Sequence, residues 1–359
     1  MLYRKGQTLF SEIQSQPKAW QEVLQTLAAQ RDTASAWIKG QGFGQVVYIA
    51  AGELLAVAQS AARVTHLVSG LNSIACAPTE LMYGRRAPYD VRIKTLVIVF
   101  SRPSVAEETG WGIEKLKTCD PRAQFLILET ENSELSSHGQ LNFVFNGVKD
   151  ATKTAVSSAT SLLMASFAIL SWLTGKEVLW NEMDKLPAIM EAQIKTWQSR
   201  AQQIVQSKPT HIVFLGSGPF RGAASLGALM MSKISGLTCE SDYFLEYRHG
   251  AYGSLTNQTM VIGLISNTFR ASEEKTLGDL AVMRANRIAV AEDAGQLAKL
   301  CDNVMELKSG VSEIARVLLT IPIMQLITFY QAMQRGVNPD NPKHLDHPAL
   351  VLKERPGMK

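Results

Sequence analysis

The sequence predicts an α/β protein made of two doubly wound parallel-sheet units that are related by internal duplication. Three observations lead to this fold class. Short apolar runs alternate with segments of helical pattern, which is typical of strands joined by right-handed crossovers. Each run is apolar at successive positions and rich in β-branched residues, as expected for strands that helices cover on both faces. Finally, the order of runs in the first half returns in the second half.

The repeat is defined by three apolar runs in each half of the chain. The runs of the first half are residues 46–50, 96–100 and 125–128, and those of the second half are residues 212–215, 260–265 and 288–290. Counted to His211, just before the first run of the second half, and to the starts of the other two runs, the second set follows the first by 165, 164 and 163 residues. A nearly constant offset over three runs indicates two copies of one α/β unit.

A chain of 359 residues is long enough for two domains. We expect a helical segment over residues 1–35 that breaks near Pro17, a first unit over residues 36–190 and a second unit over residues 191–335. A helix over residues 184–205 links the two units. The tail, residues 336–359, contains four prolines and cannot form a regular helix. Its composition fits either a disordered segment or a cover over the site, and we assign it as the cover.

Composition excludes several classes of protein. The balance of 36 basic and 32 acidic residues gives a net charge of only +4, which argues against a polybasic nucleic-acid binder. The N-terminus lacks the apolar stretch of a secretory signal. The apolar stretch 159–173 is interrupted by serines and is shorter than the ~20 residues of a membrane span, so it predicts a buried helix. Four cysteines without a C-x-x-C pair suit a reducing compartment. We therefore expect a cytoplasmic protein that binds neither nucleic acid nor membrane.

The turns after the strands are the places to look for function, because ligands of such sheets bind at the carboxyl ends of the strands. The turn 216–222 reads G-x-G-x-x-x-G, which departs from the dinucleotide fingerprint and disfavours a nicotinamide cofactor. It fits an anion site at a helix N-terminus or a tight turn without a ligand. Near residue 150, Asp150 or Thr152 is expected to cap the Ser/Ala-rich helix that follows.

Titratable residues gather in two further segments. Residues 240–250 place Glu246 and His249 before a glycine, and a histidine can move a proton near neutral pH. The same pattern also fits a solvated turn. The tail carries His344, Asp346 and His347. Two histidines and one acid on a proline-rich segment are not enough to predict a metal site. We expect neither a metal nor another cofactor.

Several stretches resemble the sugar isomerase (SIS) family. They are residues 214–229, residues 240–250 and residues 336–345. The resemblance is to the isomerase portion of glucosamine-6-phosphate synthase and to the tagatose-6-phosphate ketose/aldose isomerase group. Residues 13–24 of this chain also resemble the N-terminal helix of the latter group. It covers nearly the whole chain. It implies a homodimer of double-SIS subunits that bind a sugar derivative, with a sugar phosphate held by hydroxyl and backbone N–H groups of two turns in the first unit.

The family's phosphate turns match residues 50–54 and 101–109 of this chain, but most of their hydroxyl positions are changed. Glu53 and Leu54 stand where the first turn carries hydroxyls, and a carboxylate there repels phosphate unless Arg102 neutralises it or the ligand is cationic. The residues assigned to ligand binding are Gly52, Glu53, Ser101, Arg102, Ser104, Thr109, Thr152 and Lys153.

The family's catalytic positions are matched in part. His249 corresponds to the histidine that opens the sugar ring and reaches the neighbouring subunit, and Glu246 matches an acid of the synthase branch. Lys233 stands where the proton-shuttling carboxylate is expected, and His347 lies at or near the position of the imine-forming lysine. We assign all four as catalytic candidates. The resemblance thus implies an aldose/ketose isomerase or an amino-sugar-phosphate deaminase, with a catalytically silent sugar-binding protein as the alternative.

Overall fold

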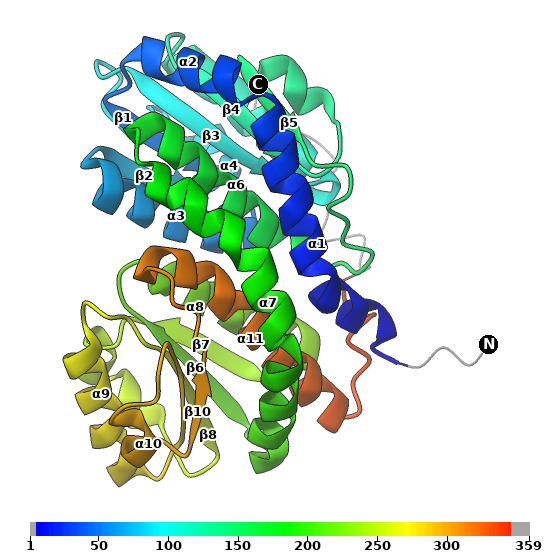
Figure 1. The fold of residues 1–359 in the computed structure, drawn as a ribbon, viewed down its shortest axis with the longest axis vertical. Helices are drawn as coiled ribbons and strands as arrows, with labels where there is room; N and C mark the ends of the chain where they lie inside the picture. The colour runs from blue at the N-terminus through cyan, green and yellow to red at the C-terminus, as the bar shows by residue number, and fades with distance from the viewer. Residues whose placement is uncertain (1–4, 346–359) are drawn as a thin grey trace. The chain divides into compact units, whose positions relative to one another are not determined.

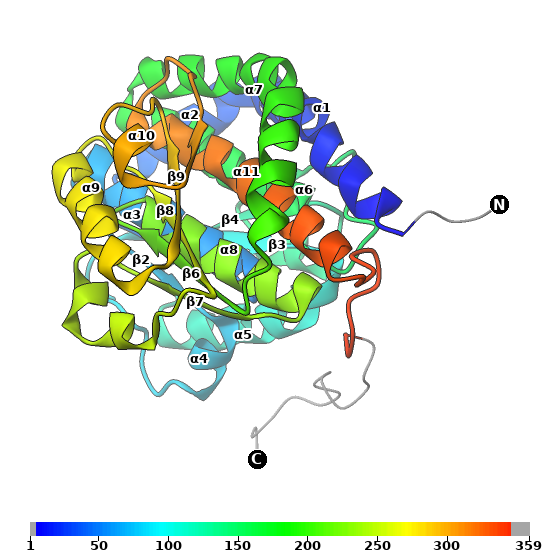
Figure 2. The same cartoon turned by 90° about the horizontal axis from the view of Figure 1, so that it is seen from below.

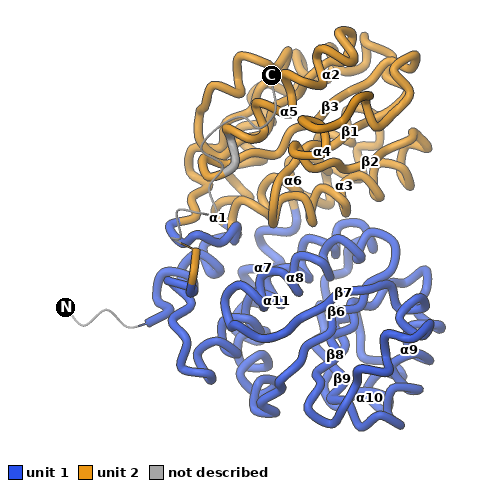
Figure 3. Tube along the Cα trace, turned by 180° about the vertical axis from the view of Figure 1, so that it is seen from behind, with its two compact units in different colours: residues 1–17, 151–156, 185–343 blue, residues 18–150, 157–184, 344–359 orange. Residues whose placement is uncertain are grey.

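The computed structural model describes residues 5–345, and within them the chain forms two parallel sheets of five strands each (Figure 1). The two sheets belong to two compact units, coloured separately in Figure 3. The β1–β5 unit contains residues 18–150 and 157–184, and the β6–β10 unit contains residues 151–156 and 185–343 together with the chain up to Pro17. The two units are described separately below.

The β1–β5 sheet has the strand order β2-β1-β3-β4-β5, with every neighbouring pair parallel. Its strands are β1 (Gln45–Ile49), β2 (Asn72–Cys76), β3 (Thr95–Ser101), β4 (Gln124–Glu129) and β5 (Leu141–Val144). β1 and β3 are buried along their whole length. Because the order reverses between β1 and β3, the topological switch point of this sheet lies at the carboxyl ends of these two strands.

Helices cover both faces of the β1–β5 sheet. On one face, α4 (Pro78–Tyr83) and α5 (Ala106–Cys119) pack Leu81, Ile113 and Leu116 onto alternate residues of β1, β3 and β4. On the other face, α3 (Glu53–Ser69) contacts β1 and β3 and packs against α6 (Ser157–Thr174), which reaches β4. Burial on both faces explains why the strands are continuous apolar runs.

The β6–β10 sheet repeats this topology with the order β10-β9-β8-β6-β7, again all parallel. Its strands are β6 (His211–Gly216), β7 (Thr238–Asp242), β8 (Thr259–Leu264), β9 (Asn286–Ala291) and β10 (Asn303–Glu306). The switch point lies here between β6 and β8.

The helices of the β6–β10 unit also lie on both faces of their sheet (Figure 2). α8 (Phe220–Ser235) packs on β6 and β7 and against α11 (Glu313–Gln334). On the opposite face, α9 (Arg270–Asp279) and α10 (Leu297–Leu300) contribute Leu277 and Leu297 to a core with β6, β8 and β9. The duplicated doubly wound fold predicted from the sequence is therefore confirmed.

All six predicted apolar runs are strands, whereas the four outer strands that flank them were not predicted. Those strands are β2, β5, β7 and β10, which are five residues long or shorter and only partly buried. A short strand that is half exposed carries no continuous apolar run, so neither periodicity nor composition reveals it.

The expected break near Pro17 is wrong, because α1 (Gln7–Ala29) continues through this residue. A proline lacks the N–H that would bond to the carbonyl four residues earlier, which here is that of Ile13. The side chain of Gln16 donates to this carbonyl at 3.1 Å and replaces the missing bond. Pro187 is likewise accommodated inside α7 (Glu177–Ile204), a longer helix than the one predicted, and α2 (Arg31–Gln41) precedes β1.

Two helices of the described chain are long and apolar enough to cross a membrane, namely α6 and α11. Both lie largely inside the protein, with 89% and 83% of their apolar windows buried. The prediction of a buried helix over residues 159–173 is thus confirmed. α6 and α11 hold equivalent places behind their sheets, which explains why both are apolar around most of their circumference.

Gly216 allows α8 to start directly above the end of β6. A Cβ atom at Gly216 would lie 2.5 Å from the carbonyl oxygen of Phe220, and the backbone cannot yield as a side chain can. We expect Gly216→Ala to lower the free energy of unfolding by about 2 kcal/mol, a typical cost of overpacking. Gly253→Ala is the control, since its Cβ would meet open space. Equal urea midpoints for both variants would contradict this explanation.

Candidate functional site

The switch point of the β1–β5 sheet brings together six of the residues predicted to bind a ligand. Gly52 and Glu53 follow β1, whereas Ser101, Arg102, Ser104 and Thr109 end β3 or follow it. The two strands are neighbours in register, so the turns after them lie side by side at the carboxyl edge of the sheet. This edge is where sheets of this topology bind ligands.

The turn from β1 to α3 depends on a glycine. Gly52 has a φ of 57° and a ψ of −127°, a conformation that other residues adopt only at a cost. A Cβ atom built on Gly52 would meet open space, so the backbone of this turn borders a gap at the edge of the sheet. Glu53 begins α3 immediately afterwards, with its side chain only 6% exposed.

The turn from β3 to α5 carries the other predicted residues. Ser101 is the last residue of β3 and Thr109 lies in α5, and both are buried. Ser104 is exposed on the short 3₁₀ turn Pro103–Val105. Arg102 stands between the strand and this turn, with its side chain 13% exposed.

Arg102 is the centre of a buried ionic cluster. Its guanidinium approaches a carboxylate oxygen of Glu53 at 3.7 Å and one of Asp150 at 3.4 Å. The two carboxylate side chains are 6% and 5% exposed, so all three charges lie largely out of water. Arg102 has to neutralise Glu53 if a phosphate is to bind, and the structure places the two charges as a pair.

Asp150 also caps α6. Its carboxylate accepts hydrogen bonds from the backbone N–H groups of Ser157 at 2.7 Å and Ser158 at 3.3 Å, and from the Ser158 hydroxyl. Burial raises the pKa of Asp150, while the Ser158 hydroxyl and Arg102 oppose this shift. Sequence reasoning found the cap but missed the contact with Arg102. An acid placed between an outer strand and the next helix is the signal that could have revealed it.

A third carboxylate ends β4 at the same edge of the sheet. Glu129 is 1% exposed and pairs in register with Ser101. Its two oxygens accept hydrogen bonds from the hydroxyls of Ser133, at 2.6 Å, and Ser136. Glu129 is therefore a structural residue, because its two hydrogen bonds hold the turn after β4.

Three other predicted residues lie together in the β6–β10 unit. Thr152 is buried and donates from both its backbone N–H and its hydroxyl to the carboxylate of Glu12, at 2.7 Å each. Lys153 is exposed, and its carbonyl accepts a hydrogen bond of 2.6 Å from the Nζ of Lys233. Lys233, which stands where the family's base is expected, thus contacts the backbone of the segment 151–156.

Glu246 and His249 lie on the short 3₁₀ turn Glu246–His249 that follows β7, and both side chains are exposed. Tyr247 between them is buried and donates to Glu240 at 3.1 Å, which anchors the turn. His347, the fourth catalytic candidate, lies outside the described residues.

The switch point of the β6–β10 sheet is occupied by the chain's own carboxylates. Glu273 accepts the backbone N–H of Ser266 at 2.8 Å, and Glu313 accepts those of Asn267 and Thr268 at 2.6 and 2.9 Å. Arg316, which is 2% exposed, donates to the side chain of Asn267 at 2.7 Å. The donors that an anionic ligand requires are therefore already used after β8.

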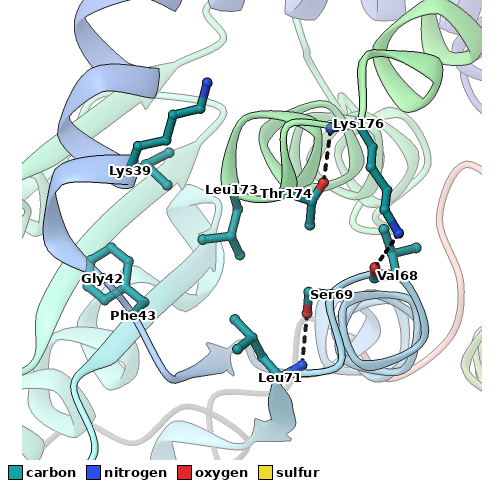
Figure 4. Close-up of a pocket in the computed structure, with 10 residues that line it drawn as sticks. Lys39, Gly42, Phe43, Val68, Ser69, Leu71, Leu173, Thr174 and Lys176 are labelled. Carbon is teal, nitrogen blue, oxygen red and sulfur yellow. Dashed lines mark hydrogen bonds between the residues drawn. The ribbon is translucent and has the colours of Figure 1, made fainter.

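A pocket of about 350 Å³ lies at the opposite, amino edge of the β1–β5 sheet (Figure 4). The C-terminal ends of α2, α3 and α6 surround it, and Lys39 and Lys176 border it. The Nζ of Lys176 donates to the carbonyl of Val68 at 2.7 Å and so satisfies a backbone acceptor in the last turn of α3. The predicted site residues do not line this pocket. Nor do residues 5–345 contain a group of three or more His, Cys, Asp or Glu side chains arranged to hold a metal ion.

The cap at α6 leads to a prediction about stability and pH. Asp150→Ala should lower the free energy of unfolding by about 2 kcal/mol, because two helix N–H groups lose their acceptor, whereas Asp150→Asn should cost about half as much. Since the pKa of Asp150 is raised in the folded state, its contribution to stability falls as pH rises above the unfolded value of 3.8. Urea unfolding of wild type and Asp150→Asn between pH 4 and pH 7 tests this. A stability difference that stays constant with pH would contradict it.

Comparison with known proteins gives relatives along nearly the whole chain. No protein-family model matches it. A Streptomyces coelicolor protein assigned as a D-galactosamine-6-phosphate deaminase is 26% identical over 92% of this chain and 90% of its own length. The isomerising glutamine–fructose-6-phosphate aminotransferase of Methanothermobacter thermautotrophicus is 23% identical over 90% of this chain, which spans 56% of that enzyme.

Solved structures show the same fold. The tagatose-6-phosphate ketose/aldose isomerase of Escherichia coli superimposes with a TM-score of 0.82 over 97% of this chain and all of its own, at 19% sequence identity. The resemblance to the sugar isomerase (SIS) family that the sequence predicts is confirmed, because the homologues and structural neighbours of this chain are SIS-domain phosphosugar isomerases, deaminases and isomerising aminotransferases.

Proposed function

We propose that this protein binds a sugar phosphate at the carboxyl edge of the β1–β5 sheet and acts on it as an aldose/ketose isomerase or an amino-sugar-phosphate deaminase. The observation that carries the proposal is the group of predicted binding residues at the switch point between β1 and β3, with Arg102 among them. The printed activities of the relatives support the same ligand class. We further propose a cytoplasmic homodimer, with SIS units over residues 36–190 and 191–335 and the tail after residue 335 over the site.

The proposed chemistry needs one group that opens the ring and one that moves a proton between neighbouring carbons. His249 is proposed for ring opening, since an imidazole can both donate and accept a proton and this side chain is exposed to a ligand or a second subunit. Glu246, on the same turn, is proposed to move the proton. Thr152 and Lys153 are proposed to bind ligand, and His347 to assist from the tail.

The second candidate function is a catalytically silent protein that binds a sugar derivative and regulates. The hydrogen bond from Lys233 to the carbonyl of Lys153 favours it. The Nζ at the expected base position thus makes a structural contact with the backbone.

Thermal unfolding tests the proposed ligand class. Galactosamine 6-phosphate and fructose 6-phosphate should each raise the melting temperature more than galactosamine and fructose do at the same concentration. A ligand present at 100 times its Kd adds about 2.7 kcal/mol to the free energy of unfolding. Stabilisation by the unphosphorylated sugars alone would remove the phosphate from the proposal.

Solvent-deuterium exchange at C2 of the bound sugar separates the enzyme from the silent binder. The enzyme should incorporate deuterium, and His249→Ala should slow this by about 100-fold or more if the ring must be opened first. His66→Ala, which removes another exposed histidine, is the matched control. Exchange that survives in His249→Ala takes this residue out of the mechanism, and no exchange in the wild type, with binding intact, favours the silent protein.

A further inference from the structure

The β1–β5 unit holds a cavity larger than the pocket of Figure 4, and the proposed function does not use it. The cavity measures about 550 Å³ and lies at the amino edge of the sheet, where β1 and β2 begin. Ligand pockets of proteins enclose about 300–1,000 Å³, so this one is large enough for a small organic molecule. None of the predicted site residues that the structure describes lines it.

Most of one wall of this amino-edge cavity is apolar. The side chains that form it belong to β2 and to the loop before β3, and they are Ile74, Pro88, Tyr89 and Ile93. Ile74 is 37% exposed at the border of the sheet, where β2 pairs on one side only, with β1 (Figure 1). An apolar ligand group that covers this wall removes apolar surface from water, which favours binding.

The loop before β3 is held in place by the chain itself. Gln45, which is 4% exposed, donates from Nε2 to the carbonyl of Asp90 at 2.7 Å and to the hydroxyl of Thr95 at 2.7 Å. The hydroxyl of Tyr89 donates to the carboxylate of Asp120 at 3.2 Å. The cavity is therefore formed in the protein alone, and a ligand does not have to order the loop when it binds.

Arg63, near the C-terminal end of α3, sets the charge of the cavity. Within the described chain its guanidinium makes no ion pair, hydrogen bond or ring contact, and α3 carries no acidic residue three or four positions away. The carboxylate of Asp90 also lines the cavity, but Arg92 pairs with it at 2.7 Å. His66 donates from Nδ1 to the carbonyl of Leu71 at 3.0 Å and so holds the turn between α3 and β2. One positive charge is left over.

Two neutral donors of the cavity are also unused. Asn72 is exposed at the start of β2, and its amide has no partner among the residues that the structure describes. The hydroxyl of Ser73 is buried in the wall and is likewise unpaired in the described chain. A carboxylate has two oxygens that only accept hydrogen bonds, so it complements a guanidinium that has further donors beside it.

We propose that this amino-edge cavity is a binding site for an organic monocarboxylate with a compact apolar body, whose carboxylate pairs with Arg63. One uncompensated guanidinium matches one negative charge and can donate to both oxygens of a carboxylate in parallel. A phosphate dianion would leave a negative charge without a partner. The apolar body lies against Ile74, Ile93 and the ring of Tyr89. The site is separate from the proposed sugar-phosphate site and does not depend on it.

Calorimetric titration with 2-naphthoate tests the proposal. 2-Naphthamide has the same rings without the charge, and acetate has the charge without the rings. Wild type should bind 2-naphthoate at least about tenfold more tightly than either. Arg63→Gln should weaken binding of 2-naphthoate by about tenfold or more and change the affinity for 2-naphthamide by less than about twofold. Because Arg63 is exposed and unpaired in the described chain, this change leaves the fold intact.

Two further variants complete the design. Arg200→Gln is the matched control, since it removes an exposed arginine of α7 that does not line the cavity, and every affinity should stay within about twofold of wild type. Ile74→Ala shortens the apolar wall. It should weaken 2-naphthoate and 2-naphthamide to the same extent, by about fivefold, because both ligands lose the same apolar contact.

The outcomes decide between a built site and general attraction of an aromatic anion. A preference for 2-naphthoate that Arg63→Gln removes and Arg200→Gln keeps supports the inference. Wild type that does not bind 2-naphthoate at millimolar concentration overturns it, as does a preference that persists in Arg63→Gln or is lost equally in Arg200→Gln. Unchanged affinities in Ile74→Ala contradict the apolar wall and overturn the assigned ligand class. None of these results depends on whether a sugar phosphate binds.

Discussion

Parallel pairing of short strands is the constraint on which this structure depends. Parallel neighbours cannot be joined by tight hairpins, so each strand is followed by a crossover that covers a face of its sheet. The strands are then buried on both sides, and all the turns that follow them gather at one edge. The chemistry of each unit is therefore set by the few residues directly after the strands, whereas the rest of the sequence has to satisfy packing.

At that edge the two units place different acceptors beside their helix N-termini. Helix N-termini leave backbone donors that need an anion. In the β1–β5 unit the carboxylates of Glu53 and Asp150 lie at two such ends, with Arg102 between them. In the β6–β10 unit Glu273 and Glu313 accept from the backbone donors after β8 directly, and the buried Arg316 donates to Asn267 and approaches a carboxylate oxygen of Glu292 at 3.8 Å.

The fold was largely predictable because the central strands are apolar throughout and recur at a constant offset. The outer strands were missed, since a segment such as Asn72–Cys76 is half exposed and carries no periodic signal. The continuous α1 was missed because the side chain of Gln16 repairs the bond that Pro17 removes, a contact that only the folded chain reveals. The site was predictable in part. Topology places Glu53 and Arg102 together, but the second partner, Asp150, comes from a distant turn and was recognised only as a helix cap.

The carboxylates of the β6–β10 switch point also bear on how the chain reaches its folded state. A turn whose donors wait for a small molecule gains part of its stability only when that molecule is present. Glu273 and Glu313 supply the acceptors from within the chain, so the turn after β8 is complete from the moment α9 and α11 are in place. The acceptors of this turn in the β6–β10 unit thus belong to the chain itself, so these hydrogen bonds form without a ligand.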